Sequence, residues 1–172
     1  MTVQATGIGG PSAAIVVGEL AEMGLRAAIR VGTCASLGPN PPLGAGLVVG
    51  AAMACEGTSA ALGAATGALV EPDSSLLRAL GTALPGEPVT VVSRDLPLGR
   101  FPDPPEGAPE SWVGDLQTAP LLLACSAARI TAAAVLAVGT CAGRRLDDEP
   151  LDAQLIRLAE SGAGALESLN LS

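Results

Sequence analysis

Histidine, tyrosine and lysine are absent from the 172 residues, and the only aromatic side chains are Phe101 and Trp112. Without histidine, the chain lacks the side chain whose ordinary pKa lies closest to neutrality, so a general base must be another group or come from a partner. With so few aromatic side chains, the core must be filled by alanine, valine, leucine and glycine. Such a core favours helices packed closely against a sheet.

Basic residues are also scarce, because nine arginines stand against 17 acidic residues and the net charge is −8. This charge argues against a nucleic-acid partner. Four cysteines lie far apart without a CxxC pair, so we expect buried thiols and neither a metal site nor disulfides. No apolar run reaches ~18 residues, and no basic region precedes an apolar core at the amino terminus. We therefore expect no membrane span, no signal peptide and a cytoplasmic protein.

Apolar runs alternate with amphipathic stretches, which predicts an α/β protein. The expected strands cover residues 2–6, 27–31, 47–52, 89–93 and 132–138. The expected helices cover residues 11–24, 72–84, 115–128 and 152–162, and the proline-rich residues 94–110 predict a long functional loop. We expect a single domain over residues 1–172, folded as a three-layer α/β/α sandwich with a mixed central sheet.

Residues 6–12 read Thr-Gly-Ile-Gly-Gly-Pro-Ser, which predicts a strand, a glycine turn and the start of a helix. Free backbone N–H groups at such a helix start favour an anion. The spacing matches neither the dinucleotide-binding fingerprint nor the P-loop. A glycine turn into a helix is by itself an ordinary structural feature.

Arg30 ends an otherwise apolar expected strand, directly before a second expected glycine turn at Gly32. Because an unpaired buried charge is costly, we expect Arg30 at the carboxyl edge of the sheet. There it would bind phosphate bidentately, with the Thr33 hydroxyl beside it. The alternative is a surface salt bridge with Glu19 or Glu56, and the residues alone favour neither interpretation.

A short segment, Val-Gly-Thr-Cys-Ala, occurs at residues 31–35 and again at residues 138–142. Both copies follow an expected strand, so an internal duplication is one explanation. The flanking residues differ, and coincidence in a chain rich in glycine and alanine is the interpretation we favour.

Residues 6–14, 30–34 and 56–59 resemble, in order and spacing, successive blocks of the uridine and purine nucleoside phosphorylase family. The resemblance implies a phosphorylase/hydrolase-like fold and phosphate-dependent cleavage of a purine or pyrimidine nucleoside to base and ribose 1-phosphate. It also implies a homo-oligomer, or a hetero-oligomer with a paralogue, and no cofactor beyond inorganic phosphate as co-substrate. The family's early loop with its phosphate-binding arginine is expected to have no counterpart here.

By the same resemblance, Gly9, Arg30 and Thr33 are expected to bind phosphate. Thr6 and Gln117 are expected to bind ribose, and Gln117 stands where the family has a glutamate. An amide still hydrogen-bonds a diol, but it lacks the charge that favours an oxocarbenium-like centre.

Fewer residues remain for the base and for proton transfer. Phe101 and Leu116 are the candidates for contact with the base, and Asp95 and Asp147 are the candidate catalytic acids. Two functions therefore stay open. The chain is either a nucleoside phosphorylase or hydrolase, or a non-catalytic member that binds nucleoside or phosphate, alone or as the partner subunit of a complete paralogue.

Overall fold

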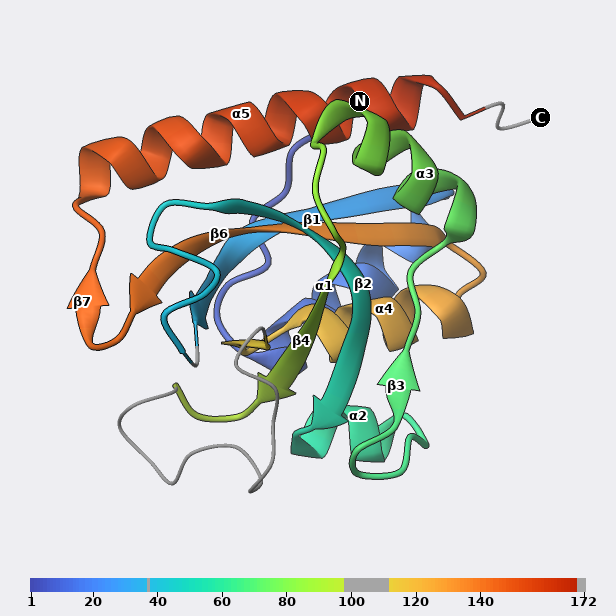
Figure 1. The fold of residues 1–172 in the computed structure, drawn as a ribbon. Helices are drawn as coiled ribbons and strands as arrows, with labels where there is room; N and C mark the ends of the chain where they lie inside the picture. The colour runs from blue at the N-terminus through green and yellow to red at the C-terminus, as the bar shows by residue number, and fades with distance from the viewer. Residues whose placement is uncertain (37, 98–111, 170–172) are drawn as a thin grey trace.

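The computed structural model describes residues 1–36, 38–97 and 112–169, which form a mixed sheet between two layers of helices (Figure 1). The sheet order is β3-β2-β4-β5-β1-β6-β7. The strands are β1 (Ala27–Ser36), β2 (Gly46–Cys55), β3 (Leu69–Val70), β4 (Val89–Arg94), β5 (Val113–Asp115), β6 (Thr131–Cys141) and β7 (Arg144–Arg145). The first residues of β2 also pair with β6, so β2 links the two halves of the sheet.

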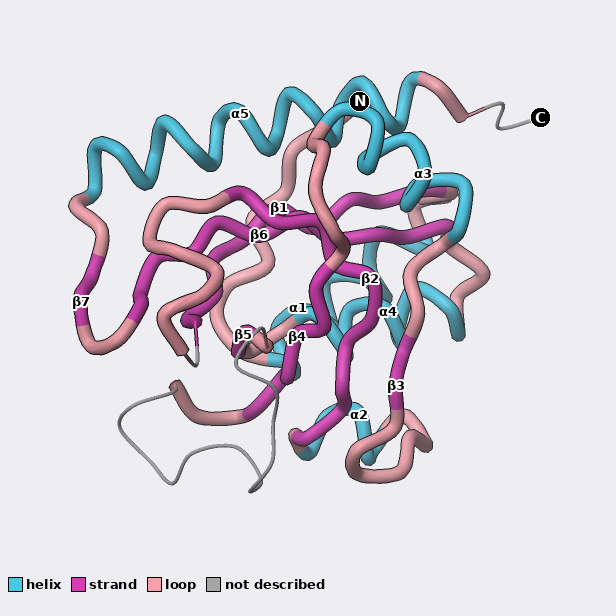
Figure 2. Tube along the Cα trace, in the orientation of Figure 1, coloured by secondary structure: helices cyan, strands magenta, loops and turns pink. Residues whose placement is uncertain are grey.

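Helices cover both faces of this sheet. They are α1 (Gly10–Glu22), α2 (Gly57–Ala61), α3 (Ser74–Ala83), α4 (Thr118–Ala127) and α5 (Asp148–Glu167). α3 and α5 lie on one face, and α1, α2 and α4 lie on the other (Figures 1 and 2). The expected three-layer α/β/α sandwich with a mixed sheet is confirmed.

The sequence of strand β6 is an unbroken apolar run because helices cover both of its faces. Ala134, Leu136 and Val138 pack in the core beneath α1 and α4, while Val135 and Ala137 pack in the core beneath α3 and α5. Successive side chains of a strand point to opposite faces, so a strand covered on both faces is apolar at every position. β6 pairs in parallel with β1 along nearly its whole length.

Two sequence predictions about local structure are wrong. Residues 1–7 form no strand and most of their side chains are exposed, because no strand of the sheet pairs with them. Gly32 and Thr33 do not form a turn, because β1 continues to Ser36 and keeps its parallel pairing with β6. The two Val-Gly-Thr-Cys-Ala copies therefore begin on neighbouring parallel strands.

Residues 113–117 differ from the expectation as well. Val113–Asp115 is the short strand β5, and the helix begins only at Thr118. β5 pairs in parallel with β4 and antiparallel with β1, so it joins two strands that are far apart in the sequence. This placement brings Asp115 beside β1, within 3.1 Å of Arg30.

Candidate functional site

A cavity of about 840 Å³ lies where the carboxyl halves of β1 and β6 meet the segment after β5. Its wall combines residues 6–9, 30–35 and 114–117 with parts of the 139–145 segment and the first turns of α5. Clefts at the carboxyl ends of parallel strands are the usual ligand sites of α/β sheets. Six of the predicted site residues line this cavity: Thr6, Gly9, Arg30, Thr33, Leu116 and Gln117.

Arg30 is buried and forms an ion pair inside the protein. Its Nη2 lies 3.1 Å from Oδ2 of Asp115, and the two side chains are 8% and 0% exposed. Burial lowers the pKa of Arg30, and the charge of Asp115 acts in the opposite direction. The alternative of a surface salt bridge with Glu19 or Glu56 is wrong, because β5 supplies a buried carboxylate next to β1.

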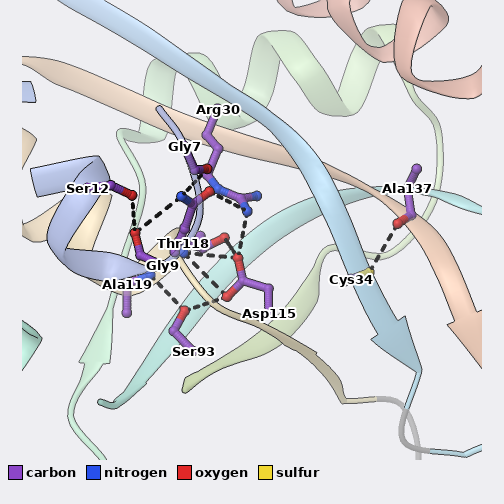
Figure 3. A network of polar contacts seen from close by, with 11 residues as sticks. Gly7, Gly9, Ser12, Arg30, Cys34, Ser93, Asp115, Thr118, Ala119 and Ala137 are labelled. Atoms are coloured by element: carbon purple, nitrogen blue, oxygen red, sulfur yellow. Dashed lines mark hydrogen bonds and ion pairs between the residues drawn. The ribbon is translucent and has the colours of Figure 1, made fainter. Parts of the chain in front are cut away.

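Asp115 is itself held by several donors (Figure 3). It accepts hydrogen bonds from Ser93 Oγ at 2.6 Å, Thr118 Oγ1 at 2.6 Å and the Thr118 backbone N–H at 3.0 Å. Ser93 Oγ in turn accepts the backbone N–H of Ala119 at 2.9 Å. Asp115 therefore satisfies donors at the start of α4 and fixes that helix to β4 and β1.

Gln117 connects Arg30 to the glycine turn at residues 7–9. Its Nε2 donates to the carbonyl oxygens of Gly7 at 2.9 Å and Gly9 at 3.2 Å. Its Oε1 accepts from Arg30 Nη2 at 3.4 Å. Both glycines have positive φ, 70° at Gly7 and 85° at Gly9, which explains the glycine-rich sequence of this turn.

Gly32 is required beneath the Arg30 side chain. A Cβ at position 32 would lie 2.3 Å from Nη1 and 2.6 Å from Cζ of Arg30, so the guanidinium rests directly on the glycine. Nε and Nη1 of Arg30 are buried and have no hydrogen-bond partner in the structure. Buried donors nearly always have partners in folded proteins, and a cation with unmatched donors in a cavity wall favours an anionic ligand.

The remaining predicted residues do not join this group. Asp95 is exposed and accepts the Gly57 backbone N–H at 3.0 Å, and Asp147 is exposed just before α5; neither belongs to the cavity wall. Phe101 lies outside the described residues. The catalytic roles of Asp95 and Asp147 therefore stay predictions, and the structure brings neither carboxylate to the cavity.

The thiols add no reactive group to the cavity wall. Burial, reinforced by the charge of Asp115, raises the pKa of Cys34 to about 12, and burial raises the pKa of Cys125 to about 11. Both thiols are therefore protonated near neutral pH and are poor nucleophiles. Within the described ranges, no group of three histidine, cysteine, aspartate or glutamate side chains is placed to hold a metal, and no helix is long and apolar enough to cross a membrane.

Sequence comparison finds short matches to curated enzymes. Uridine phosphorylase from Haemophilus influenzae is 42% identical over 59 residues, which is 34% of this chain and 23% of the relative. Uridine phosphorylase from Escherichia coli is 44% identical over 54 residues, or 31% of this chain and 21% of the relative. The match thus spans less than a quarter of the length of these relatives. No protein-family model matches the sequence.

Comparison of folds extends over nearly the whole chain. Purine nucleoside phosphorylase from Toxoplasma gondii superposes with a TM-score of 0.75 at 23% identity, over 94% of this chain and 72% of that protein. AMP nucleosidase from Bacteroides thetaiotaomicron gives a TM-score of 0.71 at 22% identity, over 94% of this chain and 68% of that protein. The short sequence matches and the fold comparison therefore lead to the same group of proteins: the chain has the fold of nucleoside phosphorylases and nucleosidases, and about a third of its sequence is similar to uridine phosphorylases.

Proposed function

We propose that the cavity binds a nucleoside together with inorganic phosphate, and that the chain cleaves the N-glycosidic bond by phosphorolysis. The observation that carries this proposal is the pair of buried, unpartnered donors on Arg30, which suits a phosphate oxygen. A volume of about 840 Å³ is ample for a nucleoside and a phosphate. The curated relatives are uridine phosphorylases, which supports the same reaction class.

In this reaction a phosphate oxygen attacks the anomeric carbon as the carbon–nitrogen bond breaks. The electron pair leaves with the base, which takes up a proton, and the products are the free base and ribose 1-phosphate. Arg30 would hold the phosphate, and the exposed hydroxyl of Thr33, on the same strand, lies in the cavity wall as a second contact. The chain would act by positioning phosphate and sugar and by balancing charge.

A second candidate is binding without catalysis, as a nucleoside-binding or phosphate-binding protein or as the partner subunit of a paralogue. One observation favours it: the two carboxylates nominated as acids lie outside the cavity wall. Asp115, which is in the wall, is occupied by Arg30, Ser93 and Thr118. A leaving base would then take its proton from water or from a group on a partner.

The test is to incubate the pure protein with uridine, inosine or adenosine, with and without phosphate, and to measure the free base. We expect base release that requires phosphate and that falls at least a hundredfold in Arg30→Lys, because lysine lacks the guanidinium fork. Base release at the same rate without phosphate would show hydrolysis and overturn phosphorolysis. No base release, together with thermal stabilisation by phosphate or nucleoside, would establish the binding candidate.

A further inference from the structure

The glycine turn at residues 7–9 is held mainly by side chains. Residues 1–7 belong to no helix or strand, so no backbone pairing anchors this end of the chain to the sheet. Gln117 donates to the carbonyls of Gly7 and Gly9, and Ser12 Oγ donates to the carbonyls of Ile8 at 2.7 Å and Gly9 at 3.0 Å. Of these two side chains, only Gln117 comes from a distant part of the sequence.

The hydrogen-bond pattern at Gln117 requires an amide. Its Nε2 supplies two N–H donors to two carbonyl oxygens, while Oε1 accepts from the Arg30 guanidinium. A carboxylate of the same size has no donor and would place negative charge against both carbonyls. Glutamate, which the family resemblance puts at this position, therefore cannot make the contacts that glutamine makes here.

We propose that Gln117 is a positioning residue that closes the glycine turn over the cavity wall and orients Arg30. Because Asp115 and Gln117 both bind Nη2, the guanidinium is held by one corner and its Nε and Nη1 remain for a ligand. The role of Gln117 at the turn stands independently, and only its benefit for ligand binding rests on the proposed function.

The three hydrogen bonds of Gln117 limit how its side chain could bind ribose. All the hydrogen-bonding groups of its side chain are engaged, two N–H donors with the turn and the oxygen with Arg30. A sugar hydroxyl would have to displace one of these contacts or share Oε1 with Arg30. A ribose contact with Nε2 would therefore compete with closure of the turn, whereas a contact with Oε1 would not.

The experiment is hydrogen exchange on the ligand-free protein, comparing wild type with Gln117→Glu and Gln117→Met. We expect exchange at least about tenfold faster over residues 8–16 in both variants, because the turn loses two hydrogen bonds. The Ala13 amide is a direct reporter, since it donates to the Gly9 carbonyl at 3.3 Å. Gln4→Glu is the matched control, because Gln4 is exposed and its side-chain amide donates to the carbonyl of the neighbouring Ala5.

The pH dependence separates a lost donor from a general loss of packing. In Gln117→Glu, a protonated carboxyl would regain one O–H donor. A glutamate carboxyl ordinarily has a pKa of about 4.3, so the excess exchange of this variant over wild type should narrow from pH 7.5 to about pH 4. The charged groups facing this site are Arg30, which favours the ionised carboxyl, and Asp115, which disfavours it. Gln117→Met has no group to protonate, so its excess exchange should be the same at both pH values.

Two results would overturn the role of Gln117. One is unchanged exchange over residues 8–16 in both variants. The other is exchange that is faster by the same factor in α3, which is remote from the turn and would report a uniform loss of stability. Since no ligand is present, neither result depends on whether the chain cleaves nucleosides, and the base-release assay tests that separately.

Discussion

Asp115→Asn is expected to lower the free energy of unfolding by about 3–5 kcal/mol, because it leaves a buried arginine without its counter-charge. The side chains of Asp115 and Arg30 are 0% and 8% exposed, so solvent cannot replace the lost interaction. The new amide would also direct N–H groups at Ser93 Oγ or at the Thr118 donors, which now donate to the carboxylate. Urea unfolding monitored by circular dichroism measures the change.

Asp148→Asn is the matched control for this prediction. Asp148 pairs with Arg145 at the same N–O distance of 3.1 Å, but the two side chains are 84% and 75% exposed. An exposed pair contributes less than about 1 kcal/mol. If Asp115→Asn and Asp148→Asn lower the free energy of unfolding by the same amount, burial of the Arg30–Asp115 pair has no energetic consequence. That result would contradict the stabilising role assigned to the pair.

Gly32→Ala is expected to abolish phosphate binding and to destabilise the protein by about 1–3 kcal/mol through overpacking. The new Cβ would fall 2.3 Å from Arg30 Nη1, so the guanidinium must leave its position. The guanidinium is also fixed on its other side by Asp115 and Gln117, and moving it breaks those contacts. Calorimetric titration with phosphate and thermal unfolding report the two effects.

Gly139→Ala tests whether the effect is specific to Arg30. Gly139 lies on the neighbouring strand β6 and also lines the cavity, but a Cβ there meets its nearest atoms at an ordinary 3.7 Å. The Gly139→Ala variant should bind phosphate within about threefold of wild type, a difference of at most about 0.7 kcal/mol. Phosphate binding that survives in Gly32→Ala would show that the present position of the guanidinium is unimportant.

Much of the fold followed from the sequence because its signals are local. The sequence predicts the apolar run of β6 and a helix over residues 72–84, where α3 spans Ser74–Ala83. Asp73 caps that helix by accepting from the Ser75 N–H at 2.9 Å. The expected strand at residues 2–6 failed for a non-local reason, because its β-prone side chains find no neighbouring strand.

The site was predicted only in part, because some of its residues have local sequence signals and others are brought together by distant segments. Arg30 and Thr33 both line the cavity, but the expected position of Arg30 at the carboxyl edge of the sheet is wrong, because β1 continues to Ser36 and Arg30 lies within it. The partner of Arg30 was missed, because Asp115 is 85 positions away and its strand β5 spans only three residues. One signal was available: Asp115 stands three residues before Thr118, the spacing of a carboxylate that caps a helix.

The most direct test of the account is calorimetric titration of inorganic phosphate into wild type and Arg30→Lys. Lysine keeps a cation for Asp115, so the variant should stay folded, but it lacks Nε and the Nη1 donors that we assign to the ligand. We expect phosphate to bind wild type and to bind the variant at least about tenfold more weakly, which is about 1.4 kcal/mol. Equal affinity in both proteins, or no binding to wild type, would contradict the assignment of Arg30 as the anion-binding residue of the cavity.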